Sequence, residues 1–236
     1  MASATLSGFP FLTAPEFDHA CRAFLTRVHA LGGPDTLGWL SARHIHRTET
    51  FTQPSPGVLR ISKTVTSGPD QHDTVGQASA DEEDAQLLGD TIQDEDHETL
   101  IRDASHDKKD QLVIDYDIAF SETYQVPVMY FVVPGIHQKG LAAIETVYQL
   151  LVPDRHRQPL KSSGVMGGIS FGYHPQSGIP AYFIHPCNTA TAMRNIAGDR
   201  GVEPETYLLV WLGLVGNCIG LNLPSYMFTQ NSVYKT

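Results

Sequence analysis

The stretch GIPAYFIHPCNTA, residues 178–190, is where an apolar run with strand character stops and a helical pattern begins. Pro186 has no backbone N–H and a fixed φ angle, so it cannot continue a strand ladder, and it restricts the preceding residue to extended geometry. The sequence therefore predicts that His185 and Cys187 lie on a stiff corner between a strand and a helix.

Cys187 is the natural candidate for chemistry at this corner. Asn188 and Thr189 are residue types that cap helices, and they precede a helical pattern over residues 190–197. A cysteine beside the unpaired N–H groups at the start of a helix is favoured as a thiolate, which is the nucleophilic form. The alternative is a buried, unreactive cysteine followed by a capping asparagine, because free cysteine is among the most buried residue types.

The three cysteines of the 236-residue chain, Cys21, Cys187 and Cys218, form no Cys-x-x-Cys pair. This spacing argues against a disulfide framework or a zinc ribbon and favours a reducing, cytoplasmic compartment. The N-terminus lacks a basic region followed by an apolar core. The longest apolar run, residues 207–221, is interrupted by Asn217 and is too short to cross a bilayer. We expect a soluble cytoplasmic protein with no transmembrane segment.

The net charge of −10 is concentrated in one segment. Residues 66–110 hold 14 of the 26 acidic residues against Arg102, Lys108 and Lys109, so the remainder of the chain is nearly neutral. The segment is poor in aromatic and branched apolar residues, which predicts an acidic, disordered insertion, either a solvated loop or a docking segment, within a single domain of residues 1–236. The chain lacks a basic stripe interleaved with aromatic residues, which argues against nucleic-acid binding.

Hydrophobic periodicity predicts a helix and then strands in the first part of the chain. Apolar residues at helical spacing indicate an amphipathic helix over residues 15–31, ended by two glycines. Residues 39–51 are an ambiguous strand, whereas residues 58–65 alternate well. Residues 112–120 and 126–133 are two strong strand signals that should pair in antiparallel fashion. The inner face of the 58–65 strand is expected to carry Leu59, Ile61, Lys63 and Val65.

The second part of the chain is predicted to be mainly helical. Helical spacing over residues 141–151 is followed by residues 154–178, which are rich in Gly, Pro, Ser and His and indicate a loop. After the cysteine corner, a long apolar helix is expected over residues 206–218. This order predicts an α+β domain with a mainly antiparallel sheet and helices packed on one side.

Three stretches carry a resemblance to a known family. They are SETYQVPVMYF at residues 121–131, HPCNT at residues 185–189, and WLGLVG with GLNLP within residues 211–224. In this chain order they closely resemble the signature stretches of the autophagy-related protein ten family, which conjugates a ubiquitin-like protein. The similarity covers residues 110–134 and 158–226. It implies a ubiquitin-conjugating-enzyme-like fold with a four-stranded antiparallel sheet and flanking helices.

The resemblance also implies an activity and its partners. Cys187, as a thiolate, would take the C-terminal glycine of the ubiquitin-like autophagy-related protein twelve from the activating enzyme, autophagy-related protein seven. A lysine of autophagy-related protein five would then attack this thioester and form an isopeptide bond. No cofactor and no metal are expected. Ordinary ubiquitin-conjugating enzymes have a His-Pro-Asn element upstream of their cysteine, whereas here the cysteine itself follows His-Pro.

The family motif further implies that His185 and Tyr124 lie beside Cys187. Both side chains would donate hydrogen bonds to a developing oxyanion or shape the surroundings of the thiolate. The structural alternatives are a histidine that braces the corner and a tyrosine that packs with its hydroxyl satisfied. Asn188 and Thr189 are expected to be helix caps rather than catalytic residues.

Two other functions remain open from the sequence. A Cys-His hydrolase would need a base for the Cys187 proton and a third group to orient that base. A non-catalytic binding module would retain the fold without thioester chemistry. A zinc site formed by His174, His185 and Cys187 lacks a convincing fourth ligand, and the remaining histidines show no clear metal-ligand spacing.

Overall fold

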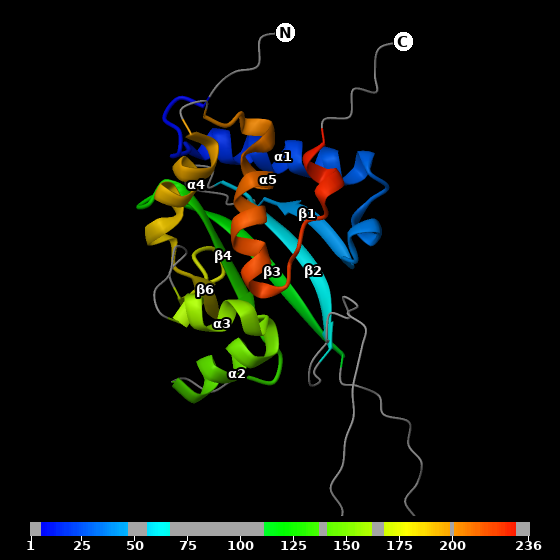
Figure 1. Ribbon diagram of the computed structural model, residues 1–236, viewed down its shortest axis with the longest axis vertical. Coiled ribbons are helices and arrows are strands. Elements are labelled where there is room, and N and C mark those ends of the chain that lie inside the picture. The colour runs from blue at the N-terminus through cyan, green and yellow to red at the C-terminus, as the bar shows by residue number, and fades with distance from the viewer. Residues whose placement is uncertain are drawn as a thin grey trace, which may run out of the picture.

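Six antiparallel strands form one sheet at the centre of the fold (Figure 1). The computed structural model describes residues 6–46, 56–66, 111–136, 141–161, 168–198 and 201–229. In spatial order the strands are β1-β2-β3-β4-β6-β5. Their bounds are β1 Ser41–Ile45, β2 Val58–Thr66, β3 Gln111–Ser121, β4 Val126–Val132, β5 Ile169–Tyr173 and β6 Pro180–Ile184. The α+β class and the antiparallel sheet are confirmed, but the described sheet has six strands rather than the expected four.

Helices precede, follow and interrupt the strands in sequence. Their bounds are α1 Ala14–Ala30, α2 Leu141–Leu151, α3 Asp154–Lys161, α4 Thr189–Ala197 and α5 Pro204–Val215, with short 3₁₀ turns at Pro34–Leu37, Pro186–Asn188, Gly216–Ile219 and Ser225–Phe228. In Figure 1, α1 lies across the upper end of the molecule, α5 runs from that end down its middle, and α2 and α3 lie at the lower end. The helix α5 ends at Val215 and continues as a 3₁₀ turn, so the helix predicted to residue 218 is slightly too long.

One face of the sheet forms the core with the helices. A row of aromatic and aliphatic side chains crosses this face, because Ile61 pairs with Tyr116, Tyr116 with Phe131, and Phe131 with Tyr182. All four side chains are buried in the same cluster as residues of α1, α2, α4 and α5. The predicted inner face of β2 is confirmed at its centre, since Leu59 and Ile61 are fully buried. Its two later members, Lys63 and Val65, are only partly buried.

The first helix begins as its sequence predicts. The Thr13 side chain accepts a hydrogen bond from the Glu16 N–H, and the Glu16 carboxylate accepts one from the Thr13 N–H, which is a capping box. Pro15 occupies the first turn, where its missing N–H costs no helical hydrogen bond. The apolar face of α1 packs on α5 and fixes the helix on the sheet.

The interpretation of residues 154–178 as mainly loop is wrong. They contain the helix α3 and the strand β5, and β5 forms the edge of the sheet beyond β6. Arg157 donates hydrogen bonds to the Val152 and Gln149 carbonyl oxygens at 2.9 and 3.0 Å, and these contacts fix the start of α3 against the end of α2. The Tyr148 hydroxyl in turn accepts the Ile169 N–H at 2.9 Å and anchors β5.

The acidic segment lies outside the described residues apart from Thr66, the last residue of β2. The structure nevertheless describes both of its attachment points, because Thr66 pairs with Gln111 in the β2–β3 ladder. Residues 67–110 therefore connect two adjacent antiparallel strands. Within the described parts of the chain, no helix combines the length and hydropathy needed to cross a membrane.

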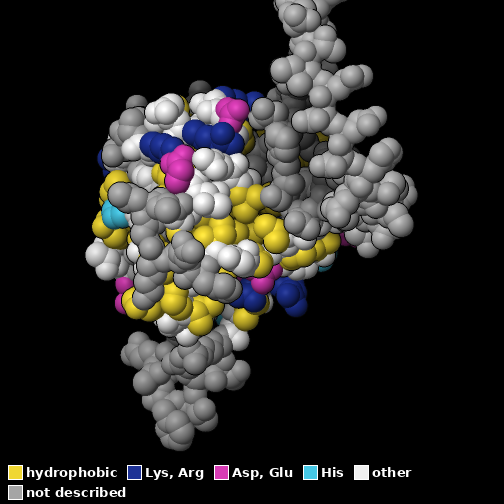
Figure 2. Space-filling model, turned by 90° about the horizontal axis from the view of Figure 1, so that it is seen from below, with side chains coloured by type: hydrophobic (Ala, Val, Ile, Leu, Met, Phe, Trp, Pro, Cys, Tyr) yellow, Lys and Arg dark blue, Asp and Glu magenta, His cyan; other side chains and the backbone are white. Residues whose placement is uncertain are grey.

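Large hydrophobic side chains reach the surface at several points. Leu40, Tyr173 and Ile196 are each more than half exposed. Figure 2 shows, on the face seen from below, hydrophobic side chains gathered side by side, with Lys, Arg, Asp and Glu near their borders. Surface of this kind is suited to contacts with other proteins.

Candidate active site

The corner predicted at His-Pro-Cys is present. The strand β6 ends at Ile184, and His185 is extended, with φ −65° and ψ 126°. The His185 N–H donates to the Gly168 carbonyl oxygen at 3.2 Å, which holds the end of the strand against the segment before β5. Pro186 is buried and opens the 3₁₀ turn Pro186–Asn188, so Cys187 lies in this turn between β6 and α4.

The His185 ring is bonded to the backbone of the cysteine. Its Nδ1 atom accepts the Cys187 N–H at 3.2 Å. Because Nδ1 is the acceptor, the neutral imidazole carries its proton on Nε2, which leaves Nε2–H available as a donor. The side chain thus orients the backbone at Cys187 through one nitrogen and presents a polar hydrogen through the other.

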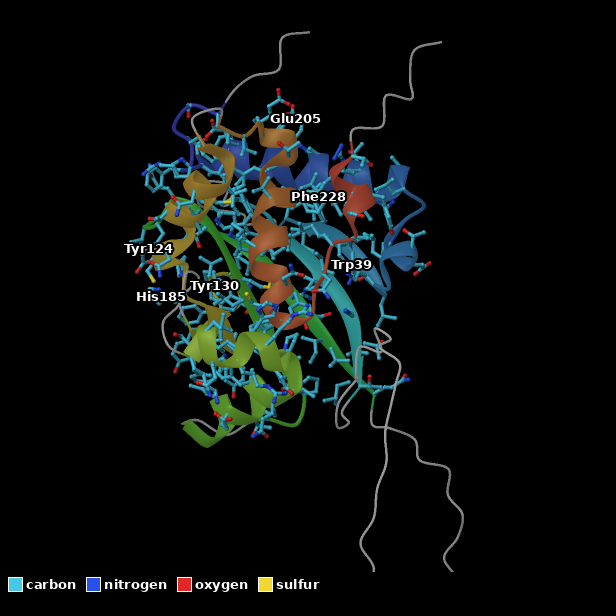
Figure 3. All side chains as sticks on the ribbon, viewed as in Figure 1. Trp39, Tyr124, Tyr130, His185, Glu205 and Phe228 are labelled. Atoms are coloured by element: carbon cyan, nitrogen blue, oxygen red, sulfur yellow. The ribbon has the colours of Figure 1, made fainter. Side chains whose placement is uncertain are left out.

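Tyr124 lies in the β3–β4 turn and reaches the His185 ring from there. The Gln125 N–H donates to the Ser121 carbonyl oxygen at 2.7 Å, and Gln125 has a positive φ of 52°, so the turn is tight. The N-terminal segment also holds the turn, since the Leu12 N–H donates to the Gln125 carbonyl oxygen at 2.8 Å. The Tyr124 ring meets the His185 ring edge to face, with centroids 5.8 Å apart (Figure 3).

The three cysteines differ in their access to solvent. Cys187 is exposed, Cys21 is fully buried and Cys218 is partly buried. Burial raises the pKa of the Cys21 thiol far above its usual range and also raises the pKa of Cys218, because a thiolate is poorly stabilised away from water. Of the three, Cys187 is therefore the thiol that a protein partner can reach.

The two residues after the cysteine are not both caps. Asn188 occupies the position before α4, but its side chain makes no capping hydrogen bond there. Thr189 is the first residue of the helix and is buried. Asn188 therefore takes the predicted N-cap position without a capping hydrogen bond, whereas Thr189 lies inside the helix rather than at its cap.

Behind the corner lies a row of rings that sequence reasoning missed. The Phe183 ring lies 6.2 Å from His185 and 5.6 Å from Tyr130, and the Tyr130 ring lies 5.2 Å from His174. Phe183 and His185 are two residues apart at the end of a strand and therefore point to the same side. The contact with Tyr130 depends on its pairing with Phe183 between β4 and β6, which no local pattern predicts.

The row of rings ends at His174, a buried polar side chain. His174 Nε2 lies 3.4 Å from the Asp117 carboxylate, and Arg60 forms two hydrogen bonds with that carboxylate at 2.6 and 2.7 Å. The Nδ1 atom of His174 accepts the N–H groups of Gln176 and Ser177. His174 therefore braces the β5–β6 turn. Among the described residues, the side chains whose donor atoms lie close enough together to hold a metal ion do not include His174, His185 and Cys187 as a group.

The chain also matches the model of a known family. The model of the family described as autophagocytosis associated protein, active-site domain, matches residues 16–226, which is most of the chain. The chain belongs to this family. The matched range begins in α1 and ends after α5, so it includes every strand of the sheet, Tyr124, and the corner at His185 and Cys187.

Individual relatives carry a more specific name. A protein of Gibberella zeae is 35% identical over 149 residues, which is 63% of this chain and 60% of the relative. A human protein is 30% identical over 47% of this chain and half of its own length. An Arabidopsis thaliana protein is 25% identical over 226 residues, 92% of this chain and 94% of the relative. Each is named ubiquitin-like-conjugating enzyme ATG10. The chain thus spans 60% and 50% of the first two relatives that it matches.

Proposed function

We propose that this protein is a conjugating enzyme for a ubiquitin-like protein of autophagy, with Cys187 as the residue that carries the thioester. The observation that carries the proposal is an exposed cysteine in a strand-to-helix turn, whose N–H is bonded to His185, in a chain of an active-site-domain family. The printed name of the relatives supports the same reaction class.

The first step is transfer between two thiols. The Cys187 thiolate attacks the carbonyl carbon of the C-terminal glycine of autophagy-related protein twelve, which is bound as a thioester to the activating enzyme, autophagy-related protein seven. A tetrahedral intermediate forms and collapses, the thiolate of the activating enzyme leaves, and a new thioester joins the glycine to Cys187. No net oxidation occurs, and one thioester replaces another.

The second step forms the stable product. A neutral lysine amine of autophagy-related protein five attacks the carbonyl carbon of the Cys187 thioester. The amine loses a proton, the Cys187 thiolate leaves, and an isopeptide bond remains. Both steps pass through an oxyanion, and Nε2–H of His185 and the hydroxyl of Tyr124 are the donors that we assign to it.

The position of His185 favours conjugation over hydrolysis. In a Cys-His hydrolase, a histidine nitrogen accepts the proton of the cysteine thiol, and a third group orients the ring. Here Nδ1 of His185 accepts the backbone N–H of Cys187, so this nitrogen is already occupied. A binding module without chemistry would not need an exposed cysteine at this corner.

A reconstituted conjugation reaction tests the proposal. The purified chain is mixed with the activating enzyme, the ubiquitin-like protein, the acceptor protein and ATP, and the products are separated under reducing conditions. We expect a conjugate of acceptor and ubiquitin-like protein that resists thiols and requires every component. Turnover of a peptide or ester by the chain alone, without ATP or the activating enzyme, would identify a hydrolase, and the absence of both a conjugate and such turnover would identify a binding module.

A further inference from the structure

A cluster of side chains that can bind a metal ion lies away from the cysteine corner. Asp18 projects from α1, His44 lies on the edge strand β1, and His46 follows that strand directly. One donor atom from each residue lies within 4.8 Å of the other two. The two histidines are two positions apart in an extended segment, and their ring centroids are 4.2 Å apart. Extended geometry therefore places both imidazoles on one side, facing α1.

His44 is the buried residue of this cluster, and its ring lacks a well-aligned hydrogen bond. The His44 side chain is only 6% exposed, yet neither ring nitrogen makes a hydrogen bond with the described residues. Its Nε2 atom does lie 3.2 Å from Oδ1 of Asp18. Buried polar atoms in native proteins are normally hydrogen-bonded or bound to an ion. A buried imidazole that contacts a carboxylate without a well-aligned hydrogen bond, and that lies beside a second imidazole, is the arrangement that a cation would complete.

The backbone at Gly57 lies close against this cluster. The Gly57 N–H donates to Oδ1 of Asp18 at 2.9 Å and so orients the carboxylate. A Cβ atom on Gly57 would lie 2.3 Å from Nε2 of His44, so glycine is required for the close approach of this backbone to the ring. A hydrogen bond from the second shell that fixes a carboxylate ligand is a regular feature of metal sites.

We propose that Asp18, His44 and His46 bind one Zn²⁺ ion, with a water molecule as the fourth ligand. Zinc takes imidazole nitrogen and carboxylate oxygen at about 2.0 to 2.2 Å in tetrahedral geometry, which separates neighbouring ligand atoms by about 3.4 Å. The pair formed by His44 and Asp18 already has nearly this spacing. His46 is exposed, so it can close on an ion that enters from solvent.

Such an ion would fasten α1 to the edge of the sheet. Apart from its apolar face, α1 is joined to β1 by the contact of Asp18 with His44. A metal bonded to residues of both elements stabilises their arrangement by its binding free energy, because the site does not exist in the unfolded chain. The inferred role is to join these two elements of the fold, and it is independent of thioester chemistry at Cys187.

Zinc binding by the untagged full chain tests this site. The protein is treated with a chelator and dialysed, and Zn²⁺ alone is then added in a calorimeter and in thermal melts. We expect one Zn²⁺ per chain. At a free concentration of about 100 times the dissociation constant, the melting temperature should rise by about 5 to 10 °C.

Matched variants locate the ion. His46→Ala and Asp18→Asn should each weaken binding at least about 10-fold, and Gly57→Ala should do so by displacing His44. His19→Ala is the control, because His19 neighbours Asp18 on α1 but contacts Glu205 at 3.2 Å instead. Without metal, His46→Ala should have the same melting temperature as the metal-free wild type, since His46 is exposed. Cys187→Ser should bind Zn²⁺ normally.

Two results would overturn the proposal. One is the absence of Zn²⁺ binding by the wild-type chain. The other is binding that His46→Ala and Asp18→Asn leave unchanged, or that Cys187→Ser abolishes, because the ion would then be elsewhere. Substitution with Co²⁺ adds a spectroscopic check: a nitrogen and oxygen site gives visible d–d bands without the charge-transfer absorption of a cobalt thiolate.

Discussion

The N–H of Cys187 has a fixed partner in the Nδ1 atom of His185, and this hydrogen bond joins the backbone of the proposed nucleophile to the ring beside it. The ring is held in turn by its contacts with Phe183 and Tyr124. A side chain with neighbours on two sides can hold Nε2–H in one direction while the acyl group is transferred. Preorganised donors of this kind lower the barrier to an oxyanion because they need not reorient.

We predict that His185→Ala slows both loading and discharge of the thioester by about 10- to 100-fold, less than a fully enclosed oxyanion hole would lose. His185→Asn separates the two roles of the ring, since its amide oxygen can replace Nδ1 as the acceptor of the Cys187 N–H. If Nε2–H is the important group, both variants are slow and both melt as the wild type does. Single-turnover discharge of preloaded enzyme and thermal melts measure this. Normal rates in both variants would remove His185 from the mechanism.

Tyr124 offers a ring and a hydroxyl that can be tested apart. Tyr124→Phe keeps the edge-to-face contact with His185 and removes the hydroxyl, whereas Tyr124→Ala removes both. We expect Tyr124→Phe to slow discharge severalfold and Tyr124→Ala to slow it further, with little change in stability because the side chain is 41% exposed. Discharge rates under single-turnover conditions give the comparison. A Tyr124→Phe rate equal to wild type, with a slow Tyr124→Ala, would assign the role to ring packing alone.

Among the elements, the connection between β2 and β3 is the part most easily altered. Its ends face each other at the Thr66–Gln111 pair, which is the geometry that a two-residue hairpin turn can close. We predict that replacing residues 67–110 with Asn-Gly changes the melting temperature by less than about 4 °C and leaves thioester formation intact. Thermal melts and the loading reaction check this. A loss of more than about 10 °C would show that the acidic segment contributes to the folded core.

Local patterns predicted those elements whose signals lie within a few residues. The helix α1 has its capping box, its proline and its apolar face in consecutive sequence, and Pro186 restricts His185 directly. The helix α3 and the strand β5 were missed because they depend on distant contacts. Arg157 donates to the carbonyl oxygens of Gln149 in α2 and of Val152 just after it, and Gly172 allows the Phe183 ring to lie close to the backbone.

The candidate site was predictable only in part for the same reason. Cys187 and His185 are neighbours in sequence, so their corner follows from Pro186. The expectation that Tyr124 lies near them came from the family resemblance, not from any pattern of spacing. Tyr130 and His174 could not be inferred, because their place behind the corner depends on the register between β4 and β6 and on the turn after β5.

The stability of the whole molecule should depend on pH through its buried histidines. Burial lowers the pKa of His174, and the charge of Arg60 acts in the same direction, while Asp117 opposes them and Tyr130 packs on the ring. The unfolded chain then binds the proton more readily than the folded protein does. The stabilisation is complete above the unfolded pKa of about 6.5 and is lost progressively as the pH falls below that value.

We therefore predict that the melting temperature falls between pH 7.5 and 5.5, and that the fall is shallower in His174→Asn. The asparagine oxygen can still accept the N–H groups of the β5–β6 turn, so the variant should fold. His29→Asn is the control, because His29 is exposed on the last turn of α1. Thermal melts of the wild type and both variants across this pH range measure the difference. Parallel curves for wild type and His174→Asn would show that other groups carry the dependence.

Of the three cysteines in the chain, only Cys187 is exposed, and it lies at the corner where the sheet meets α4. If it carries the acyl group, the adduct must form at Cys187 and at no other cysteine. Cys218→Ser is the matched control, because Cys218 is partly buried on another element and the substitution is equally conservative.

The most direct measurement is loading by the activating enzyme, the ubiquitin-like protein and ATP, read on a non-reducing gel. We predict that the wild type and Cys218→Ser form an adduct that thiols destroy. Cys187→Ser should form no such adduct, or should accumulate a slower-forming oxyester that resists thiols, since an alcohol is the weaker nucleophile and its ester is less labile. A thiol-sensitive adduct on Cys187→Ser, together with its absence on Cys218→Ser, would contradict the assignment of Cys187.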